Sequence, residues 1–383
     1  MIFKQTLRYI LLFSLVYYFF SCGKPSKSEA TKFDSEGEQI TKHFSIFEKE
    51  SYTILEISEP FVGSSSIERY LLYPKNENPP NIEGITHFIP VPVSRVGINS
   101  TTYLGLIEPL GQIDKISAAS NLNLYYSPQF QENVENGEIQ SIGQQRIEQE
   151  SLINEKLDLL FSYVIDANDL KEVKRLRELG QNVILIAEYM EQDPLEKAAW
   201  IKAMALFFGE SAELKADSIL AMVKENYDSL KKQSNEFTNQ PEVMIGYPWK
   251  GTWYVSGGNS FQAKLIEDAG ANYTWKTFDQ AGSIPLTIER VLDDALEADF
   301  WINCGNVTNF STIEKDQALL KNFKAFKNQV IYHHYKRSNA SGANDYWEQG
   351  IVRPDLILAD LVSIFHGVKD SSQSLYFYEK LAP

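Results

Sequence analysis

The chain has 383 residues, 43% of them hydrophobic and 23% charged, a composition typical of globular proteins, and its length suffices for about two domains. Its 51 acidic residues outnumber the 36 Lys and Arg residues, so the formal net charge is −15 at pH 7. Nucleic-acid binding needs basic surfaces that contact phosphates, and this charge therefore argues against a nucleic-acid partner.

Residues 1–21 form a predicted export signal. Two basic residues, Lys4 and Arg8, precede an uninterrupted apolar run over residues 9–20. About a dozen apolar residues are too few to span a bilayer comfortably, but they suit the core of a signal peptide. Cys22 follows, and the pattern resembles a bacterial lipoprotein signal, in which this cysteine carries the lipid and becomes the mature N-terminus. Phe19 departs from the usual Leu, and the alternative is an ordinary secretory signal followed by a chance cysteine.

Residues 22–42 are polar, so they are predicted to form a flexible tether to a folded body. A first α/β lobe is expected over residues 43–210, and it begins with an alternating pattern over residues 43–59 that is typical of a β-hairpin. Apolar runs at residues 157–165 and 183–189 are typical of strands covered on both faces. A helical segment lies between these two runs, and this β-α-β order predicts a mostly parallel sheet.

A long helix is predicted over residues 211–232. Its apolar residues recur at steps of three and four, as they do on the buried face of a helix. At 1.5 Å per residue the helix would extend roughly 33 Å, about the diameter of a small domain. Residues 233–383 repeat the alternation of strands and helices. The sequence therefore predicts an α/β fold with two βαβ-type lobes, mostly parallel sheets and one long rigid helix that joins the lobes.

Several segments of the body match a known pattern in their order and spacing. They are RVGINST at 95–101, LG at 110–111, ESL at 150–152 with LDLL at 157–160, GTWYVSGGNSF at 251–261, TIERVL at 287–292 and GIVRPDLILADL at 350–361. Together they resemble the substrate-binding proteins of ABC importers for iron complexes, haem and cobalamin, whose lobes are bridged by one rigid helix. The similarity extends over roughly residues 85–366. Leu157 departs from the family, which has Pro at this position.

The resemblance implies a function. The protein would be exported, lipid-anchored to the bacterial membrane and facing the periplasm. As a monomer, it would capture an iron complex (siderophore or haem) or cobalamin between its lobes. It would then deliver this ligand to a permease dimer with its ATPase subunits. Any metal would belong to the ligand as a chelate, so no resident cofactor is expected.

The resemblance also implies that one surface glutamate on each lobe fits an arginine pocket on a permease subunit. Glu150 and Glu289 occupy these positions in the sequence. A carboxylate–guanidinium pair is directional and charge-assisted, so two such pairs would fix orientation as well as affinity. The alternative is that both residues are ordinary solvated glutamates.

Aromatic residues gather near the predicted carboxyl ends of parallel strands, where ligand sites between domains form. The candidates for ligand contacts are Tyr125, Tyr126, Tyr163, Trp249, Trp253, Tyr254 and Tyr335. Flat apolar rings with polar tips suit a corrin, a porphyrin or a siderophore, and we favour Tyr126, Trp253 and Tyr254. Because 13% of the chain is aromatic, about half of the candidates are expected in the core. Basic residues near the same loops are either partners for ligand carboxylates or simply solvated: Lys250, Lys336 and Arg337.

Neither a protein metal site nor an active site is predicted. His333 and His334 are adjacent on a predicted strand, so their side chains point to opposite faces and cannot readily share one ion. Each is either an axial ligand for haem or cobalt, or a histidine whose hydrogen bonds are satisfied within the protein. Cys304 is predicted to be a small buried side chain rather than a nucleophile. We therefore predict a binding protein and not an enzyme; the alternative is an enzyme or cell-surface protein that reuses the two-lobe scaffold.

Overall fold

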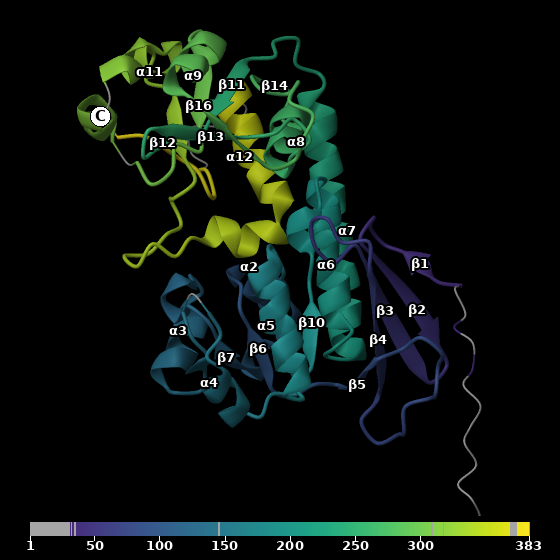
Figure 1. Ribbon diagram of the computed structural model, residues 1–383. Coiled ribbons are helices and arrows are strands. Elements are labelled where there is room, and N and C mark those ends of the chain that lie inside the picture. The colour runs from purple at the N-terminus through teal and green to yellow at the C-terminus, as the bar shows by residue number, and fades with distance from the viewer. Residues whose placement is uncertain are drawn as a thin grey trace, which may run out of the picture.

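The computed structural model describes residues 31, 33, 36–144, 146–307, 309–316, 318–367 and 374–382 (Figure 1). The predicted signal peptide and Cys22 lie outside these residues. Within the described ranges, no helix combines the length and the apolar character needed to cross a bilayer.

A five-stranded sheet opens the described chain. Its strands are β1 (Glu38–Gln39), β2 (Phe44–Lys49), β3 (Tyr52–Ser58), β4 (Ile67–Pro74) and β5 (His87–Val91). They pair in chain order and are antiparallel, except that β4 and β5 are parallel. The hairpin predicted over residues 43–59 is β2 and β3, and it belongs to this larger sheet. In Figure 1 the sheet is purple and lies beside the long helix.

The tether predicted over residues 22–42 is shorter at its body end than expected. Thr31 already exchanges backbone hydrogen bonds with the β4–β5 connection, where it accepts from Glu83 N and donates to Asn81 O, both at 2.9 Å. Strand β1 also falls within this range, and the side chains of Glu38 and Gln39 are both exposed. Backbone hydrogen bonds hold Thr31 and β1, whose polar side chains gave no signal of order, while Phe33 and Ile40 pack against apolar clusters.

The first lobe contains a parallel sheet in the order β10-β9-β6-β7-β8. Its strands are β6 (Val96–Ile98), β7 (Ile116–Ala119), β8 (Gln140–Ser141), β9 (Leu159–Ser162) and β10 (Val183–Leu185). Its helices are α2 (Thr101–Ile107), α3 (Pro128–Glu135), α4 (Gln149–Asn154) and α5 (Ala167–Glu178). Strands β6, β7, β9 and β10 are buried along their whole length, as expected for strands that are covered on both faces.

Helix α7 (Glu210–Ser234) follows α6 (Pro194–Ala205) and connects the lobes. This is the long helix predicted over residues 211–232, and it is slightly longer at both ends. Its Ala212 and Ala216 pack in the core of the first lobe, whereas Tyr227 packs in the core of the second. In Figure 1 the helix runs from the lower lobe to the upper one. One helix thus shares residues with both cores, which makes it a stiff connection.

The second lobe contains a sheet in the order β14-β11-β16-β17-β18, parallel except for β18. Its strands are β11 (Glu242–Ile245), β14 (Asn272–Tyr273), β16 (Phe300–Ile302), β17 (Ile331–His333) and β18 (Glu379–Lys380). A separate antiparallel sheet consists of β12 (Pro248–Trp249), β13 (Thr252–Ser256) and β15 (Ser283–Leu286). The helices are α8 (Phe261–Asp268), α9 (Ile288–Ala295), α10 (Phe310–Asp316), α11 (Lys324–Lys327) and α12 (Pro354–His366). The predicted α/β fold of two lobes joined by one long helix is confirmed.

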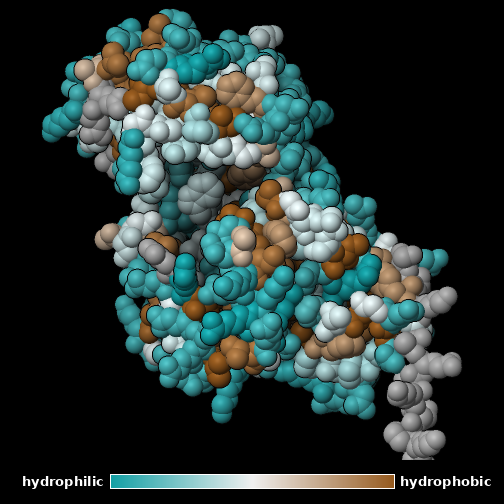
Figure 2. All heavy atoms as spheres, viewed as in Figure 1, coloured by the Kyte–Doolittle hydropathy of each residue, from teal (hydrophilic) through white to brown (hydrophobic). Residues whose placement is uncertain are grey.

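The surface is hollowed between the two lobes, as Figure 2 shows in the same view as Figure 1. A segment of the second half of the chain lies between the lobes beside this hollowed region. It consists of two 3₁₀ turns, η6 (Asp345–Trp347) and η7 (Gln349–Ile351), on either side of Glu348. The carboxylate of Glu348 accepts hydrogen bonds from the backbone N–H groups of Tyr126 and Ser127, both at 2.8 Å, at the start of α3 in the first lobe. The two lobes therefore touch beside the cleft.

Candidate functional site

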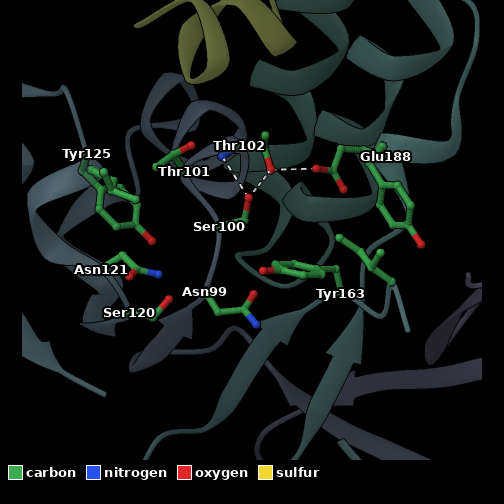
Figure 3. A pocket seen from close by; sticks show the side chains of 12 residues that line it. Asn99, Ser100, Thr101, Thr102, Ser120, Asn121, Tyr125, Tyr163 and Glu188 are labelled. Atoms are coloured by element: carbon green, nitrogen blue, oxygen red, sulfur yellow. Dashed lines mark hydrogen bonds between the residues drawn. The ribbon is translucent and has the colours of Figure 1, made fainter. Parts of the chain in front are cut away.

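A hollow of about 310 Å³ opens at the carboxyl ends of the strands of the first lobe (Figure 3). Each of four parallel strands contributes to it through the residues that follow the strand. These residues are Asn99 after β6, Ser120 and Asn121 after β7, Tyr163 after β9, and Glu188 and Tyr189 after β10. Because parallel strands end at one edge of their sheet, the fold brings these separate loops together at the usual position of an α/β ligand site.

The start of α2 supplies hydroxyl groups to the same hollow. Ser100 is the N-cap of α2, and its Oγ accepts a hydrogen bond from Thr102 N at 3.4 Å. Ser100 Oγ also lies 2.8 Å from Thr102 Oγ1, which in turn donates to Glu188 Oε1 at 2.6 Å. The bond from Thr102 holds Oε1 of the Glu188 carboxylate, while Oε2 takes no part in these contacts.

Tyrosine rings form the apolar walls. The ring of Tyr125 stacks on Phe130 with centroids 4.1 Å apart, and Tyr163 is half-buried. In Figure 3 the hydroxyl groups of Tyr125 and Tyr163 point toward the interior of the hollow from opposite sides. The site thus combines flat apolar surfaces with polar tips that face inward.

Three buried polar atoms around this hollow have no hydrogen-bond partner in the described part of the chain. They are Asn99 Oδ1, Tyr125 Oη and Glu188 Oε2, and the only other such side-chain atom among the described residues is Asn344 Nδ2. Buried polar atoms in native proteins are almost always paired, because an unpaired one costs about 1–3 kcal/mol. Three unpaired atoms around one hollow therefore indicate a site that is built for a ligand.

Burial dominates the electrostatics of the site. It raises the pKa of Glu188, and the Lys197 ammonium and the Thr102 hydroxyl offset part of this rise. Burial also raises the pKa of Tyr163, together with the nearby carboxylates of Asp169, Glu172 and Glu188. The tyrosine hydroxyls therefore stay protonated at neutral pH and can donate hydrogen bonds to a ligand.

The structure places the predicted aromatic residues in different surroundings. Tyr125 and Tyr163 line the hollow of the first lobe. Tyr126 lies next to it, and its ring is 5.5 Å from the guanidinium of Arg337. Tyr335 lines a separate hollow of about 650 Å³ in the second lobe. Trp249 and Tyr254 are 61% and 43% exposed on β12 and β13, but neither lines the hollow of the first lobe.

Trp253, which the sequence favoured as a ligand contact, is fully buried in the core of the second lobe. Its indole N–H donates to Ile245 O at 2.9 Å, and its ring packs against Trp301 at 5.5 Å. Successive side chains of a strand alternate between faces, so Trp253 and Val255 face the core while Tyr254 faces solvent. The prediction for Trp253 is corrected accordingly: its ring supports the sheet and does not reach the surface.

The candidate basic partners for ligand carboxylates have contacts within the protein. Arg337 pairs with Asp345 at 2.5 Å and stacks over Tyr376. Lys336 Nζ donates to Leu375 O, and Lys250 lies 4.4 Å above the ring of Trp249. None of these three lines the hollow of the first lobe.

The two candidate docking residues are both exposed and occupy equivalent places. Glu150 is the second residue of α4 in the first lobe, and Glu289 is the second residue of α9 in the second lobe. Within the described ranges, neither carboxylate forms an ion pair or a side-chain hydrogen bond. Their role in docking stays a prediction.

His333, His334 and Cys304 are all buried. His334 Nδ1 is 3.0 Å from Asn303 Oδ1, and burial lowers the pKa of His334 to about 3. Burial raises the pKa of the Cys304 thiol to about 12, so this thiol is not an activated nucleophile. No group of three or more His, Cys, Asp or Glu residues in the described chain is arranged to hold a metal ion.

The polar residues of the hollow are not among the aromatic candidates that the sequence indicates at the strand ends. Asn99, Ser120 and Asn121 directly follow apolar strands and were visible in the sequence. Glu188 and Tyr189 fall within the run of residues 183–189, which the sequence predicts as one strand, so they are not predicted to follow a strand end. Strand β10 instead ends at Leu185, and a 3₁₀ turn, η4 (Glu188–Met190), follows it.

No family model matches the sequence. Two uncharacterized lipoproteins from Methanocaldococcus jannaschii are similar to it. One is 25% identical over 303 residues, which are 76% of this chain and 70% of the relative. The other is 27% identical over 293 residues, which are 71% of each chain.

Solved structures of low sequence identity share the architecture. A possible iron-binding periplasmic solute-binding protein from Staphylococcus epidermidis has a TM-score of 0.57 at 19% identity and matches 72% of this chain and 100% of its own. The periplasmic haem-binding protein of Roseiflexus has a TM-score of 0.56 at 17% identity, with 72% and 98% matched. The periplasmic vitamin B12-binding protein of Vibrio cholerae has a TM-score of 0.51 at 15% identity, again with 72% and 98% matched. This chain has the periplasmic solute-binding fold.

In this periplasmic solute-binding fold the lobes enclose a cleft, and the hollow of the first lobe lies beside their contact. Tyr125 lines the hollow, and the backbone N–H of the next residue, Tyr126, binds Glu348 of the second lobe. The described residues that line the hollow all belong to the first lobe, and Glu348 contacts the residue next to one of them.

Proposed function

We propose that this protein is the lipid-anchored substrate-binding component of an ABC importer, and that it captures an iron complex (siderophore or haem) or cobalamin between its lobes. The observation that carries the proposal is the hollow of the first lobe, with tyrosine walls and unpaired buried polar atoms. Support also comes from solved proteins of the same fold, whose names describe iron, haem and vitamin B12 binding. The lipoprotein relatives support an exported protein that Cys22 anchors to the membrane, facing the periplasm.

The mechanism begins with binding of the ligand against the tyrosine rings of the first lobe. The second lobe then closes over it by a small movement, because α7 is packed in both cores and resists bending. The loaded protein next binds the permease dimer through Glu150 and Glu289, one on each lobe. Separation of the lobes on the permease releases the ligand.

A titration tests this proposal directly. The full-length protein in detergent would be titrated with cyanocobalamin, haem and a panel of ferric siderophores, while visible absorption and Tm are recorded. We expect a saturable spectral change and a higher Tm with one class, because a ligand at 100 times its Kd stabilises the folded protein by about 2.7 kcal/mol. Flat titrations with every compound would contradict the proposed function.

A further inference from the structure

We propose that the hollow of the first lobe recognises a carboxamide-like group of the ligand, one that carries both hydrogen-bond donors and an acceptor, and rejects ligands that present a carboxylate at this place. The inference rests on the proposed function, and it narrows the ligand to chelates with an uncharged or cationic polar edge. It follows from the three unpaired atoms of the hollow and from the charges around them.

Asn99 offers an acceptor to the ligand. Its Nδ2 donates to Ser162 Oγ at 2.9 Å, and Ser162 Oγ in turn donates to Tyr163 O at 3.5 Å. Because the serine proton is directed to this carbonyl, the serine oxygen must accept from the amide nitrogen of Asn99. This network fixes the orientation of the amide and leaves Asn99 Oδ1 as the atom without a partner.

Glu188 offers a second acceptor, and Tyr125 offers a donor. Glu188 is 3% exposed, and its Oε1 accepts from Thr102 Oγ1, whereas its Oε2 is unpaired. Tyr125 is 1% exposed, and its hydroxyl is also unpaired. Two acceptors and one hydroxyl donor on the walls of one hollow complement a ligand edge that carries primary carboxamides, each with two N–H donors and one carbonyl oxygen.

The charges around the hollow disfavour an anionic group. None of the residues that line it is Lys or Arg. Lys197 is the cation next to Glu188, but its Nζ donates to the backbone carbonyl of Glu188 at 3.1 Å from a buried position. Arg146 lines the adjoining hollow together with two carboxylates, Asp169 and Glu172. A ligand carboxylate would bring no donor to Asn99 and would face Glu188 without a free cation beside it.

The test uses pairs of ligands that differ at one group. The pairs are cyanocobalamin and its monocarboxylic acid, haem bis-amide and haem, and ferrioxamine B and its N-succinyl derivative. Each would be titrated into the full-length protein, and Kd would be measured by tryptophan fluorescence. In the pair that binds, we expect the member without the carboxylate to bind at least tenfold more tightly. Equal or tighter binding of the carboxylate member would overturn the inference but leave the proposed function in place.

Glu188→Gln sharpens the test, because Thr102 holds one oxygen of this side chain. The free position then carries an NH₂ donor in place of an acceptor, so we expect the preference for the uncharged ligand to fall to threefold or less. Glu178→Gln is the matched control, since Glu178 is exposed on α5 of the same lobe and should leave the preference unchanged. A preference that persists in Glu188→Gln would contradict the assigned role of Glu188.

Tyr125→Phe provides a second variant, because it removes only an unpaired hydroxyl and keeps the stacked ring. We expect Tm of the unliganded protein to stay within about 2 °C and the affinity for the uncharged ligand to fall at least fivefold. Unchanged affinity would count against the inference. If no compound of the three pairs binds to the wild-type protein, the proposed function fails together with the inference.

Discussion

Glu348 is a buried carboxyl group that binds the two lobes to each other. It is 1% exposed, and its two oxygens accept hydrogen bonds from the backbone of Tyr126 and Ser127. Burial raises the pKa of Glu348 to about 8, and the nearby carboxylates of Asp345 and Glu108 add to this rise, while the two backbone N–H groups oppose it. The group is therefore largely protonated in the folded protein at neutral pH, although it would be ionised in the unfolded chain.

The free energy of unfolding should depend on pH because of this carboxyl group. Below pH 4.5 both states hold the proton, and between pH 4.5 and about 8 only the folded state holds it. This group therefore lowers the free energy of unfolding by roughly 1.4 kcal/mol for each pH unit of rise within that window, and its effect levels off above pH 8. Denaturant unfolding of the wild type and Glu348→Gln from pH 4 to 9 would measure the difference.

The difference in stability between wild type and Glu348→Gln isolates this residue from other titrating groups. At pH 5 the variant should be less stable by about 1 kcal/mol, because the amide NH₂ faces one of the two backbone N–H groups. That advantage should be lost near pH 6, and above pH 8 the wild type should be the less stable of the two proteins. Glu178→Gln, exposed on α5, should follow the wild type throughout, and parallel curves for wild type and Glu348→Gln would refute the prediction.

Helix α2 approaches the Glu348 segment backbone to backbone, and Gly105 makes this approach possible. A Cβ atom at position 105 would lie 1.9 Å from the backbone oxygen of Glu348, a distance at which one of the two segments must move. The glycine therefore permits a close contact between the lobes, whereas elsewhere in a helix it would only add flexibility.

Gly105→Ala should destabilise the protein even though alanine is the better helix former. The gain in helix propensity is about 1 kcal/mol, and overpacking against a backbone atom costs about 1–3 kcal/mol. We expect a net loss of stability in denaturant unfolding. Gly282→Ala is the control, because its added Cβ would meet no atom within 4 Å and its backbone is not left-handed. A Gly105→Ala variant that is more stable than the wild type would show that the lobes do not meet here.

Helices with clear end signals can be predicted from the sequence. Ser100 caps the start of α2 and Gly111 ends the turn that follows it, and Ser260 caps α8 before Gly270 ends it with a φ of 75°. The side-chain positions within the site were harder to predict, because they depend on where a strand ends. Residues 183–189 are uniformly apolar up to Glu188, so nothing local showed that the strand stops at Leu185 and turns a carboxylate into the hollow.

The burial of Trp253 could have been predicted from its neighbours. Its strand β13 is the central strand of a three-stranded sheet, and its side chains alternate, so Trp253 and Val255 share one face while Tyr254 lies on the other. Tyr125 and Tyr163 line the hollow of the first lobe, and their contact with a ligand stays a prediction.

The two lobes present similar helix starts to a partner. Glu150 and Glu289 each stand in the first turn of a short helix, on α4 and α9, which Figure 1 shows on separate lobes. A negative charge in the first turn of a helix is favourable, so these carboxylates are stable in place before any partner binds. Two equivalent contacts on two lobes suit a partner with two similar subunits.

Replacing both docking residues should separate binding from transport. In Glu150→Ala/Glu289→Ala we expect ligand Kd to stay within about twofold, because neither residue lines the hollow, and uptake by cells to fall by at least roughly tenfold. The matched control is Glu178→Ala/Glu236→Ala, which removes two other exposed carboxylates. Uptake that is equal in both double variants would argue against docking through α4 and α9.

The bond between Thr31 and the β4–β5 connection determines how the protein would sit on a membrane. If Cys22 carries the lipid, the chain from Cys22 to Thr31 reaches about 30 Å at full extension. The purple sheet lies on the opposite side of α7 from α4 and α9 (Figure 1). A short anchored segment on that side would hold the protein close to the membrane surface. Its encounters with membrane-bound partners would then depend on lateral diffusion of the lipid rather than on bulk concentration. If Glu150 and Glu289 dock to a permease as proposed, rotation of the protein about this anchored segment would bring them to it.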